Sequence, residues 1–499
     1  MGGLAKTIPK LASDWATERH SQKGWPKFLE SVKVNGIRGW SGQMVEFRFP
    51  VVAIAGENGA GKSTVLKAAA SAYSQDPSAA GTLAQTFSPD DFFPTTPWEI
   101  VSGAQLTYLA KQGASSFPYH VRKHTKRWRG MPERPKRPVF FLDISRTQPI
   151  DTLIGYGRLA VAKMASGNFS AVIDDEYLGV LSRVLDRTYD SGEIVQSNNK
   201  QVGVLATSGR KYSNFHQGAG EDATADLVAL LQNAPRHSLV IIDEVEASLH
   251  PRAQRRLMTE LIGLAQKNRL QIIVSTHSQY VLEQLPPEAR LVLTTDEQGI
   301  KEVIYGATTE LALSLMDDEV HPELILYCED EKAEYLVHRF IDYTDPDSHS
   351  RLAVVIAGPA SSVKTLGLMA DQGRLPGLVM GVLDGDQNES PGCAIIPGGT
   401  SPERAVYEGL SSDGWRIVAE RLGVREGDLV DAWEHAQRIP EKHHVWTERI
   451  AEKLPAHIRK SRIWEAACDV WIIDMLPEEV RNEFVGDLLQ FLPPVSRRP

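Results

Sequence analysis

An eight-residue loop, from Gly56 to Ser63, constrains this chain more than any other feature of its sequence. It reads GENGAGKS and fits the pattern G-x-x-x-x-G-K-[ST], with an apolar run, VVAIAG, before it and a helical pattern after it. Glycines let a backbone wrap closely, so that successive N–H groups and the start of a helix point at a bound phosphate. A glycine-rich surface turn is the alternative, but it does not require this strand and helix. We therefore predict a nucleotide site in an α/β domain.

The side chains of this loop have distinct predicted roles. We expect Lys62 to reach the β- and γ-phosphates of ATP, and Ser63 to bind the accompanying Mg²⁺. The backbone of the other positions would surround the phosphates. These further cofactor-binding positions are Gly56, Glu57, Asn58, Gly59, Ala60, Gly61 and Thr64.

Two carboxylates follow a second apolar run, LVII. Asp243 and Glu244 lie at its C-terminal end, where open α/β sheets bind their ligands. We predict that Asp243 binds Mg²⁺ and cofactor, and that Glu244 is the catalytic residue that orients or deprotonates the attacking water. Helix capping is the alternative for an apolar run followed by Asp-Glu. His277 ends a third apolar run, LQIIVST, and is a candidate catalytic residue that senses the γ-phosphate.

The segments GENGAGKS, IIDEVEASLHP and VSTHS resemble the Walker A, Walker B with D-loop, and switch-histidine motifs of SMC-like ABC ATPases. The resemblance covers about residues 28–315 and implies an ABC-type P-loop head over residues 1–315. It also implies a homodimer or higher homo-oligomer, because two heads of this type close around two ATP molecules. The signature motif, which would meet the nucleotide of the other head, corresponds to QGAGE, with Gly218 in the position of the usual serine. Its candidate cofactor-binding residues are Gly218, Gly220 and Glu221, and Gln85 is a candidate for the glutamine loop.

Residues from about 75 to 200 read as an insertion in this head. Prolines interrupt the segment and no heptad pattern is sustained, so we expect a compact dimerisation arm rather than a coiled coil. Its stretch at 122–137, RKHTKRWRGMPERPKR, contains eight Lys and Arg residues against one acidic residue. With Trp128 it suits contact with a nucleic-acid backbone and stacking on a base. A solvated arm face or a protein interface is the alternative.

A second α/β region extends over about residues 320–408. The apolar runs LILYC, LAVVIAG and LVMGVLD alternate with helical patterns, which predicts a parallel sheet. Glu329 and Asp330 follow the first run, and Asp384 and Asp386 follow the third. Crowded carboxylates repel one another unless a cation compensates, so Mg²⁺ or Mn²⁺ is the expected partner, and it could assist phosphodiester hydrolysis. A solvated acidic turn is the alternative.

This layout resembles a Toprim domain, and an SMC-like ATPase followed by a Toprim domain resembles the overcoming-lysogenisation-defect (OLD) family of ATP-dependent nucleases. Some of these act in anti-phage defence. The resemblance implies that Glu329, Asp384 and Asp386 are catalytic, with Glu329 as a metal ligand or base and the two aspartates as metal ligands. The first motif reads CEDEKAEYL, so its second acid, a further metal ligand, is Asp330 or Glu334. It implies an ATP-regulated endonuclease that cuts duplex DNA, with a defence-system protein or nucleic acid as a further partner. Additional candidates are Glu334 and Glu403 as ligands and Lys364 as the lysine that some members use.

Residues 409–499 show a mainly helical pattern. In this region His443 and His444, beside Trp446, could contact phosphate, or could pack and cap helices. The net charge of −10 argues against a globally basic nucleic-acid binder but leaves room for local patches. Three widely separated cysteines and the lack of a long apolar run predict a cytoplasmic protein with no membrane partner. The alternative function is a non-cleaving SMC-like ATPase that serves as a DNA sensor, repair clamp or scaffold.

Overall fold

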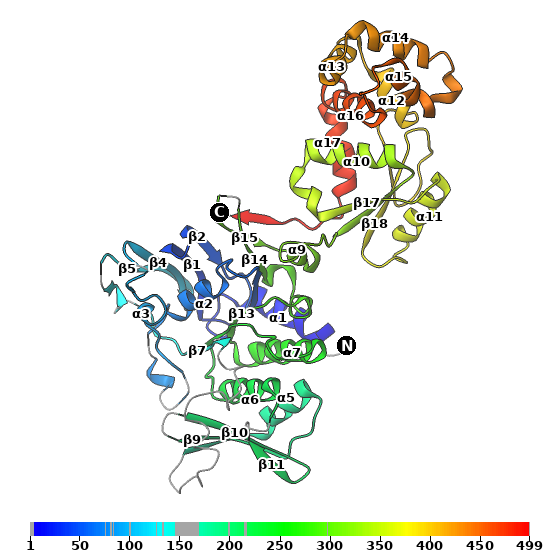
Figure 1. The fold of residues 1–499 in the computed structure, drawn as a ribbon. Helices are drawn as coiled ribbons and strands as arrows, with labels where there is room; N and C mark the ends of the chain where they lie inside the picture. Colours follow the sequence, from blue (N-terminus) through cyan, green and yellow to red (C-terminus); the bar gives the residue numbers. More distant parts are fainter. Residues whose placement is uncertain are drawn as a thin grey trace. The chain divides into compact units, whose positions relative to one another are not determined.

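The protein, seen here as a computed structural model, is mixed α/β and divides into two compact units (Figure 1). The first unit contains Met1–Met316 and Pro494–Pro499, and the second contains Asp317–Pro493. The structure describes residues 4–498 apart from 75, 80–81, 83, 99–100, 126, 132–133, 145–168, 198–199, 214–216 and 297.

The first unit is built around a sheet that contains, among the described residues, seven strands in the order β20-β15-β14-β3-β13-β12-β7. Three neighbouring strands, β3 (Val51–Gly56), β13 (Gln271–Ser275) and β12 (Leu239–Ile242), run parallel, and every residue in them is buried. Burial on both faces explains why these segments are so apolar. The other strands are β7 (Val139–Leu142), β14 (Arg290–Thr295), β15 (Lys301–Tyr305) and β20 (Ser496–Arg498).

Helices connect and cover these strands. The helix α2 (Lys62–Ala70) begins at the last two residues of the phosphate loop, Lys62 and Ser63. The helix α7 (Pro251–Asn268) leads from β12 towards β13, with His250 as its N-cap and Pro251 at its first position, where proline is tolerated. The shorter or more peripheral helices are α1 (Leu4–Glu18), α3 (Pro89–Phe92), α5 (Asp175–Leu185), α6 (Ala219–Gln232), α8 (Gln279–Leu282) and α9 (Thr309–Ser314).

Two antiparallel sheets complete the first unit. One has the order β2-β1-β4-β5-β6, and the other has the order β11-β10-β9-β8. The first consists of β1 (Lys27–Ile37), β2 (Trp40–Glu46), β4 (Ala104–Gln112), β5 (Ser115–Lys123) and β6 (Trp128–Arg129). The second consists of β8 (Phe169–Ile173), β9 (Ser191–Ser197), β10 (Lys200–Thr207) and β11 (Arg210–Ser213).

The described part of residues 75–200 differs from the separate arm that we expected. The strand β4 pairs with β1 over eight residues of β1, and β7 pairs with β12 in the central sheet. Both strands therefore belong to the core of the first unit. Strands β8 and β9 lie outside these two sheets. Any inserted element therefore contains fewer residues than the range of about 75–200 that the sequence pattern suggests.

The second unit contains a parallel sheet with the order β17-β16-β18-β19, as the alternating pattern predicts. Its apolar core continues from the sheet into the helices that follow, through Leu326, Tyr407, Trp433 and Trp471. Tyr407 stacks on Trp415 and Trp433 with ring centroids 6.1 and 5.6 Å apart, so aromatic side chains hold this helical region together.

The strands of the second unit are β16 (Leu324–Cys328), β17 (Leu352–Ile356), β18 (Leu378–Leu383) and β19 (Cys393–Ile395). Its helices are α10 (Glu331–Thr344), α11 (Ala360–Asp371), α12 (Pro402–Gly409), α13 (Ser412–Leu422), α14 (Glu426–Ala436), α15 (Trp446–Lys453), α16 (Lys460–Val470) and α17 (Glu478–Leu489). A search of the described residues of both units finds no helix with the length and apolar character needed to span a membrane.

Candidate functional site

The phosphate loop lies between β3 and α2, and its glycines are required by its shape. Gly56 and Gly61 have φ values of 141° and 104°, a region that other residues rarely adopt. A Cβ atom at Gly56 would lie 2.3 Å from the carbonyl oxygen of Leu293, and one at Gly61 would lie 2.6 Å from Nε1 of Trp40. Residues of β14 and β2 therefore pack against the loop on two sides and leave no space for a side chain at Gly56 or Gly61.

Lys62 is buried at the start of α2 and folds back on its own loop. Its Nζ donates to the carbonyl oxygens of Gly56, at 2.8 Å, and of Glu57, at 3.1 Å. The same nitrogen lies 2.8 Å from Nε2 of His277. Burial lowers the pKa of Lys62, and the carboxylates of Glu244 and its neighbours partly oppose this effect. A mobile anion such as a phosphate would meet a cation that the protein has already desolvated.

Ser63 and Asp243, the two predicted Mg²⁺ ligands of this site, are adjacent. Oγ of Ser63 donates to one carboxylate oxygen of Asp243 at 3.0 Å, and Oγ of Ser275 donates to the other at 2.5 Å. Ser275, at the end of β13, also accepts the backbone N–H of Glu244 at 2.8 Å. Ser275 thus fixes the orientation of both acidic residues, although the pattern VSTHS drew attention only to its histidine.

Glu244 and His277 face each other beside Lys62. Oε1 of Glu244 lies 3.3 Å from Nε2 of His277, and the φ of Glu244 is 51°, in the left-handed region. The backbone N–H of His277 donates to the carboxylate of Glu246 at 2.5 Å, which fixes the turn after β13. The structure therefore brings Lys62, Ser63, Asp243, Glu244 and His277 together at one edge of the parallel sheet, as an ATPase site requires.

Two more residues hold the phosphate loop, and no sequence pattern indicates either of them. Lys301, on β15, is buried and donates to the carbonyl oxygen of Gly59 at 2.9 Å and to Oγ1 of Thr295 at 2.8 Å. Sδ of Met316 accepts the backbone N–H of Gly56 at 3.2 Å. The loop is thus supported by a strand and a segment that are distant from it in sequence.

The signature-like segment lies elsewhere in the head. Gly218 is the N-cap of α6, and Gly220 packs closely on Ser248 in the turn after Glu244. The carboxylate of Glu221 accepts hydrogen bonds from Tyr189 at 2.5 Å and from Tyr212 at 2.9 Å. The side chain of Glu221 is therefore engaged within its own head.

The basic stretch at 122–137 contains both buried and exposed basic side chains, and the expectation of a stacking ring at Trp128 is wrong. Trp128 is only 7% exposed, and Lys123, at 1%, pairs with Asp90 at 2.9 Å and lies over the Trp128 ring. Arg134 and Arg137 are also buried and donate to backbone carbonyl oxygens. The charge count overstated the exposed basic surface, because buried guanidinium groups here complete the hydrogen bonding of loops.

Gln85, the candidate for the glutamine loop, lies at the surface. Its backbone N–H donates to the carbonyl oxygen of Val139 at 3.0 Å, and its side chain is exposed. This contact places Gln85 beside β7, at the edge of the central sheet. The described contacts give it no role at the phosphate loop.

In the second unit, the predicted acidic residues lie at the C-terminal ends of β16 and β18. Glu329 accepts the backbone N–H of Asp384 at 3.4 Å, which links the two strand ends. Asp330 is the N-cap of α10 and accepts the backbone N–H groups of Lys332 and Ala333 at 2.9 and 3.0 Å. Asp330 therefore has the structural role that the alternative interpretation gives to such residues.

Asp384 is the exceptional carboxylate of this group. Its Oδ1 atom is buried and makes no hydrogen bond in the described structure. Burial raises the pKa of Asp384 to about 8, and repulsion from Glu329, Asp330 and Asp386 adds to the effect. A desolvated, unpartnered oxygen beside other carboxylates is the chemistry that a hard divalent cation satisfies.

Two neighbouring side chains that the sequence suggested for the acidic site, Glu403 and Lys364, already have partners. Glu403 is buried and pairs with Lys332 at 2.8 Å, so its charge is already compensated. Lys364 donates to Gln387 at 3.0 Å, and Gln387 donates to Asp386 at 3.0 Å.

The remaining candidates have no described link to the acidic turn. Glu334 lies in the first turn of α10, and the ring centroid of His443 lies 6.2 Å from that of Trp446. The backbone carbonyl oxygen of His444 accepts from Lys332 at 3.0 Å. Over the described residues, no three His, Cys, Asp or Glu side chains are close enough together to hold a metal ion as they stand.

Comparison with known proteins identifies the first unit as an ATPase. The family model "AAA domain" matches residues 31–93, which contain the phosphate loop. The model "AAA domain, putative AbiEii toxin, Type IV TA system" matches residues 158–283, which contain Asp243, Glu244 and His277. No curated protein matches the chain. The two family matches confirm the predicted ATP-binding ATPase domain.

Solved structures of SMC heads show a distant similarity. The SMC head domain from Thermotoga maritima has 15% identity and a TM-score of 0.35, over 56% of this chain and 99% of that one. The Smc head domain from Pyrococcus furiosus, bound to the C-terminal domain of ScpA, has 12% identity and a TM-score of 0.36, over 56% of this chain and 96% of that one.

Proposed function

We propose that this protein is an ATP-regulated, divalent-metal-dependent DNA endonuclease. ATP is bound and hydrolysed in the first unit, and a phosphodiester is hydrolysed at the acidic site of the second unit. The observation that carries the proposal is the buried Oδ1 atom of Asp384, which lacks a hydrogen-bond partner among the crowded carboxylates at the ends of β16 and β18. Most buried carboxylate oxygens in proteins have a hydrogen-bond partner, so an unpartnered one supports a bound cation.

At the acidic site, Glu329, Asp384 and Asp386 would hold Mg²⁺ or Mn²⁺, with Asp330 beside them at the start of α10. A divalent cation supplies charge neutralisation for the attacking and leaving oxygens of a phosphodiester. The protein itself keeps the acidic residues together, because Gly385 has no space for a side chain: a Cβ atom there would lie 2.6 Å from the carbonyl oxygen of Thr400. We assign a Toprim-like domain to residues 320–408 and a helical region to residues 409–499.

In the first unit, Ser63 and Asp243 would hold the Mg²⁺ that accompanies ATP. Lys62 would exchange its bonds to the loop carbonyls for bonds to the β- and γ-phosphates. Glu244 would orient or deprotonate the attacking water, with His277 beside it at the γ-phosphate. We further propose a homodimer, in which Gly218 and its neighbours at the start of α6 meet the nucleotide of a second copy.

Regulation by ATP is supported by the points at which the chain leaves and re-enters the first unit. Met316, the last residue before the second unit, contacts the N–H of Gly56. After the second unit, β20 pairs with β15, and β15 carries Lys301, which contacts Gly59. The connection at Met316 therefore begins beside the phosphate loop, so a change in loop conformation can act on it directly. The returning chain enters β20 opposite Tyr305, four residues along β15 from Lys301.

A role in bacterial anti-phage defence accords with two observations. The resemblance to OLD nucleases includes members that act in defence, and the family model matched at 158–283 is named for the toxin of a toxin–antitoxin system. Duplex DNA is the proposed substrate. The described basic side chains that remain exposed for contact with it include Arg127, Arg129 and Lys136.

Plasmid cleavage tests the proposal directly. Supercoiled plasmid is incubated with the protein and Mg²⁺ or Mn²⁺, with and without ATP, and nicked and linear products are measured. We expect Asp384→Asn to abolish cleavage and to retain ATP hydrolysis, and Glu244→Gln to bind ATP without hydrolysing it. Full cleavage by Asp384→Asn contradicts the nuclease assignment.

The second candidate is a non-cleaving ATPase that acts as a DNA sensor, repair clamp or scaffold. It is favoured by the ion pair between Glu403 and Lys332, which removes one carboxylate from the acidic site. Absence of nicking with either metal, with ATP present or absent, would support this function. DNA-stimulated ATP hydrolysis in the same samples would then show that DNA is nevertheless a partner.

A further inference from the structure

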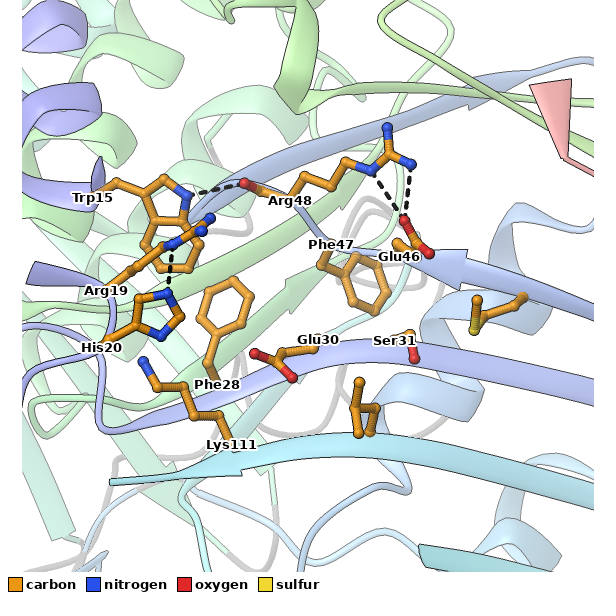
Figure 2. A pocket seen from close by; sticks show the side chains of 12 residues that line it. Trp15, Arg19, His20, Phe28, Glu30, Ser31, Glu46, Phe47, Arg48 and Lys111 are labelled. Carbon is orange, nitrogen blue, oxygen red and sulfur yellow. Dashed lines mark hydrogen bonds and ion pairs between the residues drawn. The ribbon is translucent and has the colours of Figure 1, made fainter. Parts of the chain in front are cut away.

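A pocket of about 410 Å³ lies in the first unit between α1 and the antiparallel strands β1, β2 and β4 (Figure 2). This volume is in the range of small-molecule sites. The pocket residues Phe28 and Ser31 lie in the first half of β1, whereas the far end of this strand, at Ile37, turns towards Trp40 and the phosphate loop. At about 3.3 Å per residue, Ser31 and Ile37 are roughly 20 Å apart, so the pocket is separate from the ATP site.

Aromatic side chains form one wall of the pocket. The rings of Trp15 and Phe28 are 4.7 Å apart and tilted by 41°, and Phe47 lines the same space. Nε1 of Trp15 donates to the carbonyl oxygen of Arg48 at 3.0 Å, which fixes the indole ring on the sheet. A planar apolar group would find a preformed surface here, with little conformational entropy left to lose.

Two of the cations at the pocket already have partners. Arg48 pairs with Glu46 at 2.8 Å and lies 4.0 Å over the ring of Tyr305. Arg19 donates to Nε2 of His20 at 2.9 Å, at the exposed rim. Neither side chain is therefore a first choice for binding a ligand in the interior.

Lys111 is different, because it is 4% exposed and makes no described hydrogen bond or ion pair. Figure 2 shows Lys111 and Glu30 extending into the same space as the ring of Phe28. Glu30 acts on Lys111 electrostatically but is not paired with it. A largely buried lysine whose ammonium group faces an open pocket without an ion-pair partner is available to an anionic group that enters the pocket.

We propose that this pocket binds a small aromatic amino acid or a close analogue. The ring would lie against Trp15 and Phe28, the carboxylate would pair with Lys111, and the ammonium group would pair with Glu30. This ligand class uses the aromatic wall, Lys111 and Glu30 together. A phosphorylated compound fits less well, because its second negative charge would face Glu30 with only one uncommitted interior cation available.

Calorimetric titration of the full chain, without nucleotide, tests the proposal with L-phenylalanine and L-tryptophan as probes. We expect saturable binding of at least one probe below about 1 mM, and affinity about tenfold lower for phenylpropionate and phenethylamine, which each lack one charged group. Lys111→Met should abolish binding, whereas Lys33→Met, an exposed change on the same sheet, should leave it unchanged. Absence of saturable binding, or equal binding by Lys111→Met, overturns the proposal.

Thermal unfolding separates this role from a structural one. If Lys111 serves a ligand, Lys111→Met should unfold at the same or a higher temperature than the wild type, because a buried charge without a partner is removed. The probe should raise the unfolding temperature of the wild type only. A lower unfolding temperature for Lys111→Met, with no effect of the probe on either protein, contradicts the assignment. Competition between ATP and the probe for binding would also contradict it.

Discussion

Asp243 in the first unit and Asp384 in the second both follow a buried parallel strand, but the protein treats them differently. Both carboxylate oxygens of Asp243 accept hydrogen bonds, from Ser63 and Ser275. Asp384 has a buried oxygen without a partner and a pKa raised to about 8 by burial and by nearby carboxylates. The ATP site is preorganised by its own side chains, whereas the acidic site has unfavourable electrostatics that a proton or a bound cation would relieve.

The largest effect is expected from a change to the preorganised loop. Gly61→Ala places a methyl group against Trp40 at a backbone φ of 104°, so the loop must distort. We expect ATP affinity to fall by about 100-fold or more, measured by titration with a fluorescent ATP analogue. The matched variant Gly385→Ala, at the acidic turn, should leave ATP affinity unchanged. A loss in both variants would mean that the two sites are not structurally distinct.

Stability measurements sharpen the same comparison. Asp384→Asn removes a crowded charge and should raise the free energy of unfolding by about 1–3 kcal/mol, whereas Asp243→Asn loses favourable contacts and should lower it by a similar amount. Chemical denaturation, followed by fluorescence, gives both values.

Addition of Mg²⁺ to the nucleotide-free proteins should stabilise the wild type more than Asp384→Asn. Destabilisation by Asp384→Asn in the absence of metal would show that this carboxylate is structural.

A smaller effect is expected at the support of the phosphate loop. Lys301→Met removes the bond to the carbonyl oxygen of Gly59, and we expect ATP affinity to fall by about tenfold. Lys301→Arg keeps a donor and should recover part of the loss. Isothermal titration with ATP tests both variants, and a change in hydrolysis rate without a change in affinity would contradict a positioning role.

The smallest effect concerns the signature-like segment. Gly218 has open space around its Cα and an ordinary φ of −71°, so serine fits there. As the N-cap of α6, Gly218→Ser should stabilise the protein by a few tenths of a kcal/mol. It would also restore the usual signature serine, so we expect steady-state ATP hydrolysis to rise about twofold. Slower hydrolysis would indicate that this position does not meet nucleotide.

Local patterns predicted the strands that carry the candidate ATP site, because these strands are apolar and buried on both faces. The strands β3, β12 and β13 could be read directly from their apolar composition, and Lys62, Asp243 and His277 follow from motifs. Lys301 and Met316 could not be predicted, because their contacts with the loop depend on chain pairing over long sequence separations.

The basic stretch at 122–137 shows a case in which the sequence predicted more functional surface than the structure contains. A count of positive charges at 122–137 suggests an exposed surface, but composition does not reveal which guanidinium groups are used internally. Arg137 is fully buried beside Tyr73 and donates to Gln271 at 2.8 Å, and Arg134 closes a loop. Only tertiary structure distinguishes such residues from the exposed Arg127 and Arg129.

The pairing of β20 with β15 has a consequence for how the protein folds. The whole of the second unit separates these neighbouring strands in sequence, so a ribosome completes β15 well before it supplies its partner. During that interval β15 is an open strand edge, and open edges promote association between chains. Closure of this edge requires a long-range contact, which is slow to form. We therefore expect the ATPase head to be most prone to aggregation during synthesis, until the second unit has emerged and β20 has paired with β15. In refolding, the same risk lasts until this pairing forms.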